Sequence, residues 1–521
     1  MDMNGEDIWS IVMTAVCETE EAEGEKYRVP AIGIRGKGKC VVEWGDGAHD
    51  RCEMEIEEGM LRCMEHAYER PGRYRICVRG AERGDAVWEF SFYEQDGVNG
   101  YTALALSGCT ELRELDCSDG RLESLELGGC VGLEELSCGN NRLEDLDVGG
   151  CVRLRELYCG GNRLERLDVS GCRELKELWC FKNRLTELRV EGCGKLEQLQ
   201  CYGNRLTHLS VEGCGRLKEV GCRENLLTGL DVSRNTKLAV LDCCVNRLTE
   251  LNVSGCGRLK ELNCRENWLT ELELDGCGEL RELDCERNRL TRLEVRVCGK
   301  LEELCCGKNE LTELNLKGLP KLWGVNCMQC RLEVLEFDTT LTSLECRENR
   351  LTELDMSGCR GLEELYCGEN RLVRLVVKGC GKLERFYCYK NRLARLDVSG
   401  CGRLLYMGCA DNYLTELEVG GCRKLRELLC GENRLEVLDV NGCRELERLD
   451  CRNNRLTRLK VEGCVRLESI CCPDNRLTRL EVGGCPELEY LACSQNRLKG
   501  LDVSRCTKLK KLYCEDNPMN R

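Results

Sequence analysis

The chain has 521 residues and a formal net charge of −15, and 46 of its residues are cysteine. This acidic balance excludes a general nucleic-acid binder, because contacts to phosphates need an excess of lysine and arginine on the binding face. With 42% hydrophobic residues, a chain of this length can bury a large leucine core and does not need disulfides to fold.

The first predicted element is a strand over residues 8–16. This apolar run follows Asp2, Glu6 and Asp7 rather than basic residues and has no small-residue cleavage site after it, so it does not fit a secretory signal peptide. No stretch approaches the roughly 20 apolar residues that span a bilayer, so we expect no membrane insertion. Secretion would require a signal outside this sequence.

Up to residue 95 the chain alternates β-branched and aromatic runs with turn residues, which is typical of the short strands of a β-sandwich. The runs are KCVVEWGDG (39–47), CMEHAYERPGRYRICVRG (63–80) and AVWEFSF (86–92). Within the first of them, Asp46-Gly47 is a strong hairpin signal.

Three short motifs of this region resemble the polycystic-kidney-disease type of sandwich domain. They are Trp44–Gly47, His66–Tyr68 and Pro71–Tyr74. The resemblance implies a sandwich domain over residues 1–95, which would shield the apolar interior of the first repeat from water.

From residue 96 to residue 521 the chain repeats a 21-residue unit, LxxLxCxxNxLTxLxVxGCxx. One cysteine recurs at this step from Cys117 to Cys327 and from Cys346 to Cys514, which gives twenty rungs. A second cysteine recurs seventeen times, and an asparagine follows the first cysteine by three residues in eighteen rungs. The segment DGVNGYTALALSGC already fits the unit from Asp96, with Asn99 in the asparagine position.

Each unit holds the apolar spacing L-x-x-L-x-[C/V] twice, so two extended segments point apolar side chains inward within one coil. The sequence therefore predicts a β-rich solenoid, a leucine-rich-repeat array of about twenty 21-residue coils with a parallel strand face, preceded by the N-terminal β-sandwich. The repeated asparagine is predicted to bond backbone groups of its own coil and of the adjacent coil.

The cysteines admit three interpretations, namely stacked free thiols, disulfides or a metal site. Identical positions on neighbouring coils place Cβ atoms about 4.8 Å apart, whereas a disulfide needs about 3.8 Å, so the spacing favours free buried thiols. The single CxxC motif joins the ladder cysteine Cys327 to Cys330, which replaces the ladder asparagine, and is weak evidence for zinc. We predict no metal and no cofactor.

The repeat as a whole resembles bacterial leucine-rich-repeat surface proteins with 21-residue units, including the internalin group that carries a cysteine ladder, over residues 101–517. Relatives often read VSxNTxL in the second half of the unit, and this chain keeps that form once, at Val232–Leu238. The resemblance implies a protein at the cell surface or outside the cell. The many thiols suit a reducing cytoplasm, which is the alternative location.

Catalysis is not expected, because the chain has few convergent polar groups. Histidine occurs only at His49, His66 and His208, and no phosphate-binding glycine loop or HExxH motif is present. The predicted function is non-catalytic binding of a protein or a glycan, in surface adhesion or recognition by a bacterium. The alternative is an intracellular scaffold for protein–protein interaction.

The predicted ligand site is the concave strand face, at two clusters of outward-pointing aromatic residues beside glycines such as Gly160, Gly161 and Gly203. Rings on a rigid sheet suit a protein hot spot or a sugar ring, and the alternative is that they only stack on one another across strands. The candidates are Tyr158, Trp179, Phe181 and Tyr202, and then Tyr366, Tyr387, Tyr389 and Tyr406.

A stripe of arginine is the other surface feature, because fifteen of the twenty rungs carry arginine directly after the asparagine position. Two interpretations stay open. The stripe could bind an acidic polymer, or it could form a solvated network with the glutamates that begin the strands in ten rungs.

Two irregularities complete the prediction. Between residues 319 and 346 the rung spacing is 19 instead of 21, and Pro320 and Cys330 interrupt the pattern, so the solenoid is expected to kink or thin there. Leu509 to Asn517 forms a half unit, which predicts an open strand edge and either a missing downstream segment or weak end-to-end self-association.

Overall fold

The computed structural model describes residues 9–17, 27–28, 31–55, 60–82, 84–92 and 100–519, so the predicted position of Asn99 lies outside it. The described residues form strands and turns, and no helix occurs among them. No helix able to cross a membrane is therefore found in this part of the chain.

The N-terminal region forms two sheets of mainly antiparallel strands. One has the order β12-β10-β1-β8-β4-β5, in the other β3 pairs with both β6 and β9, and β2 pairs with β7. The hairpin predicted at Asp46-Gly47 is confirmed, because β4 and β5 pair on either side of it. The strands are β1 Ser10–Cys17, β2 Tyr27–Arg28, β3 Ile32–Lys37, β4 Lys39–Glu43, β5 His49–Glu53, β6 Arg62–Met64, β7 Ala67–Tyr68, β8 Gly72–Gly80, β9 Ala86–Phe92, β10 Gly100–Ser107 and β12 Ser124–Gly128.

These sheets continue directly into the repeat on both of its strand rows. β9 pairs in parallel with β11 (Glu114–Asp116), with Phe90 opposite Leu115, and β10 pairs in parallel with β12, with Leu104 opposite Leu125. The interior of the first coil is therefore covered by N-terminal residues. Because β10 takes part in both regions, the sandwich domain over residues 1–95 stays a prediction.

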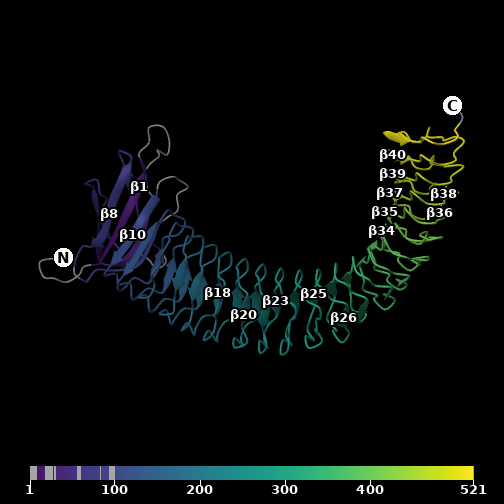
Figure 1. The fold of residues 1–521 in the computed structure, drawn as a ribbon. Helices are drawn as coiled ribbons and strands as arrows, with labels where there is room; N and C mark the ends of the chain where they lie inside the picture. The colour runs from purple at the N-terminus through teal and green to yellow at the C-terminus, as the bar shows by residue number, and fades with distance from the viewer. Residues whose placement is uncertain are drawn as a thin grey trace. The chain divides into compact units, whose positions relative to one another are not determined.

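The chain divides into two compact units, each of which is described by itself: Met1–Trp268 with Asp275–Cys277, and Leu269–Leu274 with Gly278–Arg521. Within each unit, one short strand per coil pairs in parallel with the strand of the next coil, so that Leu136 lies opposite Leu157 and Leu428 opposite Leu449. Figure 1 shows strands β34, β35, β37, β39 and β40 of the second unit stacked in this way. The solenoid with a parallel strand face is confirmed.

This first strand row runs along both units. In the first unit, after β11, it contains β13 Glu135–Ser137, β14 Glu156–Tyr158, β16 Glu177–Trp179, β18 Gln198–Gln200, β19 Glu219–Gly221, β21 Val240–Asp242 and β23 Glu261–Asn263. In the second unit it contains β24 Glu282–Asp284, β25 Glu303–Cys305, β27 Gly324–Asn326, β29 Ser343–Glu345, β31 Glu364–Tyr366, β33 Arg385–Tyr387, β34 Tyr406–Gly408, β35 Glu427–Leu429, β37 Arg448–Asp450, β39 Ser469–Cys471, β40 Tyr490–Ala492 and β41 Lys511–Tyr513.

The second extended segment of the repeat forms shorter parallel pairs. They are β15 Arg166–Asp168 with β17 Glu187–Arg189, β20 Gly229–Asp231 with β22 Glu250–Asn252, β26 Glu313–Leu316 with β28 Val334–Phe337, β30 Glu353–Asp355 with β32 Arg374–Val376, and β36 Val437–Asp439 with β38 Arg458–Lys460. Both segments predicted from the doubled apolar spacing are therefore extended in the structure.

Both cysteine ladders lie inside the coils as free thiols. Cys409 and Cys430 of the first ladder are fully buried, and Cys464 of the second ladder donates a hydrogen bond to the Val440 carbonyl oxygen over 3.1 Å. No disulfide occurs among the described cysteines. The thiol therefore acts as a small apolar side chain with a weak donor.

The ladder asparagine joins each coil to the preceding one. At Asn433 the side-chain oxygen accepts the N–H of Leu414 over 3.0 Å, and the amide nitrogen donates to the carbonyl oxygens of Cys409 and Cys430 over 3.0 and 3.2 Å. The same pattern recurs at Asn141, Asn162 and Asn183. The predicted role of the asparagine is confirmed.

The residue before the ladder asparagine has a positive φ in every coil, which the sequence did not predict. Glycine takes this position only at Gly161 and Gly203, and the other coils place a residue with a side chain there, such as Val245 at φ 54°. A left-handed residue tightens the turn after the strand, and the regular hydrogen bonds of the asparagine hold it in that conformation.

The irregular segment 319–346 keeps its strand pairing. β27 pairs with β29 in register despite the 19-residue step, and β26 pairs with β28. The coil is shortened after β28, where the N–H of Thr342 donates to the Trp323 carbonyl oxygen over 2.8 Å. At the missing asparagine, the Cys330 thiol donates to the Cys306 carbonyl oxygen over 3.4 Å. The strand rows therefore pass through the segment where a kink was predicted.

Candidate functional site

The outward side of the first strand row, here called the strand face, carries the candidate residues. In each strand of this row except β41 the central apolar residue is buried, while the residues on either side of it and the residue after the ladder cysteine point outward. At β31, for example, Leu365 is fully buried and Tyr366 is half-buried. The period-of-two argument thus placed all eight predicted aromatic residues correctly on this face.

In the first unit, Tyr158, Trp179, Phe181 and Tyr202 form one continuous aromatic cluster. The ring centroids of Tyr158 and Trp179 are 5.7 Å apart, and the Phe181 and Tyr202 rings stack in parallel at 4.8 Å. The guanidinium group of Arg223 lies 4.6 Å from the Tyr202 ring centroid and closes this stack. The predicted stacking across strands is therefore present here, and the rings cover one another.

Two glutamates accept hydrogen bonds from Tyr158 at one end of this first cluster. The Tyr158 hydroxyl lies 3.1 Å from a carboxylate oxygen of Glu156 and 3.1 Å from one of Glu177. Burial, followed by these two negative charges, raises the pKa of Tyr158. The phenol therefore stays protonated and donates. The indole nitrogen of Trp179 is buried without a hydrogen-bond partner, which makes it an unusual donor among the described residues.

Glycines on neighbouring coils make room for the rings, as predicted at Gly160. A Cβ atom on Gly160 would lie 2.9 Å from the Phe181 ring, whereas a Cβ atom on Gly161 or Gly203 would meet the Asn140 or Lys182 side chain instead. In the second unit, Gly368 and Gly408 have the same role, because their Cβ atoms would lie 2.9 and 2.7 Å from the rings of Tyr389 and Tyr387.

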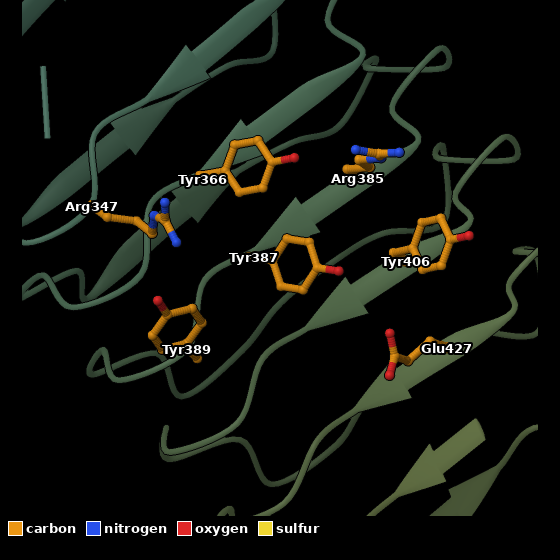
Figure 2. Close-up of a pocket in the computed structure, with 7 residues that line it drawn as sticks. All are labelled: Arg347, Tyr366, Arg385, Tyr387, Tyr389, Tyr406 and Glu427. Carbon is orange, nitrogen blue, oxygen red and sulfur yellow. The ribbon is translucent and has the colours of Figure 1, made fainter. Parts of the chain in front are cut away.

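In the second unit, the four predicted tyrosines line one pocket of about 490 Å³. Tyr366 and Tyr387 stack in parallel with centroids 5.6 Å apart, and Figure 2 shows their hydroxyl groups and that of Tyr406 turned in the same direction. Tyr389 lies on the other side of the pocket, over Gly368. These rings open onto a cavity.

Three charged residues complete the pocket. Arg347, Arg385 and Glu427 line it together with the tyrosines (Figure 2). Sequence reasoning missed them, although they occupy the same outward positions of the repeat as the tyrosines. The usable signal was that arginine interrupts the glutamate row at Arg385 and follows a ladder cysteine at Arg347.

Both guanidinium groups have neighbours in the protein, and the Arg385 side chain is 53% exposed. Arg347 donates to both carboxylate oxygens of Glu345 over 2.9 and 3.0 Å, and its hydrogen bonds to Glu345 and Tyr389 raise its pKa. Arg385 lies 5.7 Å from the Tyr406 ring centroid, and its hydrogen bond to Tyr366 raises its pKa. Both groups remain positively charged and act as donors.

The arrangement suits binding rather than group transfer. No cluster of histidine, cysteine and acidic residues able to hold a metal ion occurs in the described part of the chain. Burial raises the pKa of the ladder thiols, to about 12 at Cys409, which disfavours the nucleophilic thiolate. His66 stacks on Trp44 and contacts the Asp46 carboxylate at 2.7 Å within the N-terminal sheets.

Solved structures similar to this chain support the fold. YopM from Yersinia enterocolitica is 24% identical, with 81% of this chain and 88% of that chain covered and a TM-score of 0.59. The chain has the leucine-rich-repeat fold. The Arabidopsis receptor kinase HAESA, solved in complex with the peptide hormone IDA and the co-receptor SERK1, is 20% identical over 78% of this chain and 79% of that chain, with a TM-score of 0.56.

The remaining comparisons add no further support for the fold. The functional domain of InlJ from Listeria monocytogenes, described as including a cysteine ladder, is 27% identical over 76% of this chain and 73% of that chain, with a TM-score of 0.44. No protein-family model and no curated protein matches the chain. The leucine-rich repeat and its cysteine ladder therefore stand on the geometry described above.

Proposed function

We propose that this leucine-rich-repeat protein is a non-catalytic recognition protein that binds a segment of a protein ligand in the tyrosine pocket of its second unit. The observation that carries the proposal is the pocket itself, in which four tyrosines and two guanidinium groups line one cavity. Tyrosine and arginine are among the residues that dominate the energy of protein interfaces.

The physical basis is preorganisation. The rings are held by stacking and by close contact with Gly368 and Gly408, so little side-chain entropy remains to be lost on binding. Flat apolar rings with hydroxyl groups offer both contact area and hydrogen bonds. A glycan would use the same features, and it is the other outcome of the test below.

The place of action is part of the proposal. The resemblance to bacterial surface proteins favours surface adhesion, and an intracellular scaffold is the alternative that suits the free thiols. A signal peptide or a wall-sorting tail in the full gene would distinguish the two.

The weak end-to-end self-association expected from the sequence also stays a prediction. At β41, the last strand of the first row, Leu512 is 40% exposed and would be available for such a contact.

The test is a screen of the whole chain against a displayed library of random peptides and against a glycan array, followed by affinity measurements on variants. Tyr387→Ala and Tyr406→Ala are each expected to weaken binding of a selected peptide by roughly thirtyfold or more, the loss of at least about 2 kcal/mol that marks an interface hot spot. Trp179→Ala with Tyr202→Ala shows whether the first cluster contributes as well.

Tyr490→Ala is the matched control, because Tyr490 begins β40 as Tyr406 begins β34 and is also half-buried, but it lies outside the pocket. Equal losses in Tyr406→Ala and Tyr490→Ala would place the ligand elsewhere on the strand face. Selection of sugars but of no peptide would replace the protein ligand by a glycan.

A further inference from the structure

Another surface of the second unit carries a dense group of positive charges. Arg455, Arg476 and Arg497 follow the ladder asparagine in three consecutive coils, and all three are exposed. Their N–H groups donate to the carbonyl oxygens of the preceding coils over 3.0, 2.9 and 2.9 Å. The three arginines therefore stand at equivalent positions, one strand spacing of about 4.8 Å apart.

A second row runs beside the first. Arg458 and Arg479 stand three residues further along their coils, and Lys499 lies next to this row in the last of the three coils. Threonine, at Thr457 and Thr478, occupies the positions between the two rows. We call these six basic residues the arginine grid: Arg455, Arg458, Arg476, Arg479, Arg497 and Lys499.

Partners are unevenly distributed along the arginine stripe of this unit; among the described residues, Arg371 and Arg392 form no ion pair within 4.0 Å, as in most of the grid. Other stripe arginines have acidic partners, because Arg331 contacts Glu310 at 3.0 Å and Arg350 contacts Glu333 at 3.8 Å. Arg434, in a third coil, lies 4.6 Å from the centroid of the Tyr413 ring. These three arginines at the same repeat position have local partners.

Within the grid, Arg479 pairs with Glu481. Among the residues that the structure describes, the other five grid residues form no ion pair within 4.0 Å. Asp474, Glu481 and Asp502 are the acidic residues on the turns that carry the grid. Unpaired like charges one strand spacing apart repel one another, and a bound anion relieves that repulsion. The grid is also an exception on a chain whose net charge is −15.

The surroundings narrow the class of anion. The backbone N–H groups of the first row are already bonded between coils, so the grid offers no free strand edge to an acidic peptide. The turns RNNRLTRLK, PDNRLTRLE and SQNRLKGLD contain no aromatic ring on which a base could stack. Guanidinium forks repeated at fixed spacing match carboxylate or sulfate groups repeated along a stiff chain.

We infer that the arginine grid binds a linear anionic polysaccharide through its carboxylate or sulfate groups. This second binding surface is independent of the tyrosine pocket, because the two share no residue. It would hold the protein on a charged glycan while the pocket engages its own ligand.

The test uses the whole chain and heparin, a sulfated polysaccharide, immobilised on a sensor at low ionic strength. The triple variant Arg455→Gln, Arg476→Gln, Arg497→Gln is expected to bind heparin roughly tenfold to hundredfold more weakly than the wild type. The matched control is Arg331→Gln, Arg350→Gln, Arg434→Gln, which removes the same charge from the same repeat position where the arginine has a partner. This control should retain at least about half of the wild-type affinity.

Each possible result decides something. Loss of heparin binding in the grid variant alone, with unchanged thermal stability in both variants, supports the assignment. Equal loss in both variants would show a general effect of net charge and overturn it, as would the absence of heparin binding by the wild type. Equal affinity for polyglutamate or for single-stranded oligothymidylate would show an unselective anion surface and overturn the polysaccharide assignment.

Discussion

Replacing Asn433 by alanine is expected to lower the free energy of unfolding of the second unit by about 3–5 kcal/mol, because several buried hydrogen bonds are lost together. The amide of Asn433 bonds the Leu414 N–H and the carbonyl oxygens of Cys409 and Cys430, at 3.0–3.2 Å, while the side chain is only 8% exposed. Alanine would leave these backbone groups without a partner and away from water. Urea denaturation followed by circular dichroism measures the loss.

Asn517→Ala is the matched control for this prediction. Asn517 makes equivalent bonds, to the Leu498 N–H over 3.0 Å and to the Cys493 carbonyl oxygen over 2.9 Å, but it is only half-buried. Water can replace its amide, so a loss of less than about 1 kcal/mol is expected. Equal losses at the two positions would mean that the burial of a ladder asparagine does not determine how much it contributes to the free energy of unfolding.

Phe386→Ala is expected to cost about 3–5 kcal/mol, since it removes a large side chain from a closely packed interior and leaves a cavity. Phe386 is fully buried at the centre of β33, with Leu365 and Met407 opposite it on the adjacent strands. It takes the position that leucine holds in most coils, directly beneath the outward residues Arg385 and Tyr387 of the tyrosine pocket. Calorimetric melting of the variant measures the loss.

Phe386→Leu keeps most of the apolar volume and restores the residue that the repeat uses elsewhere. It should cost no more than about 1.5 kcal/mol and leave the pocket able to bind its ligand. A similar loss in the leucine and alanine variants would contradict packing as the cause. It would point instead to a specific need for an aromatic ring under the pocket.

Much of the fold was predictable because each coil repeats the same physical problem. The doubled L-x-x-L spacing set both strand rows, and the asparagine could reach backbone groups in its own coil and in the adjacent one, as Asn162 does. The left-handed residue before the asparagine was not predicted, because Val245, Glu224 and Lys182 share no side-chain feature that signals a positive φ. The hydrogen bonds around the turn impose that conformation, whereas the intrinsic backbone preferences of these residue types do not favour it.

The candidate site was predictable only in part. Period-two alternation placed Tyr366, Tyr387, Tyr389 and Tyr406 on one face, but it could not distinguish rings that cover each other from rings that open onto a pocket. That difference depends on side-chain direction and on local neighbours, as with Phe181 over Gly160 in the first cluster. The charged residues of the pocket were missed because glutamate and arginine occur at outward positions throughout the repeat, so their presence alone does not indicate a site.

The central claim is that the repeated cysteines and asparagines build the interior, so that recognition is left to the outward strand face and the turns. A thiol titration of the natively purified protein with an aromatic disulfide reagent, without and with denaturant, tests this most directly. The native protein should react at only a few cysteines, such as the exposed Cys63, because burial both blocks the ladder thiols and raises their pKa, to about 12 at Cys409. Denaturant should expose nearly all 46 thiols. Rapid reaction of the ladder cysteines in the native protein, or extensive disulfides found by mass mapping, would contradict the account.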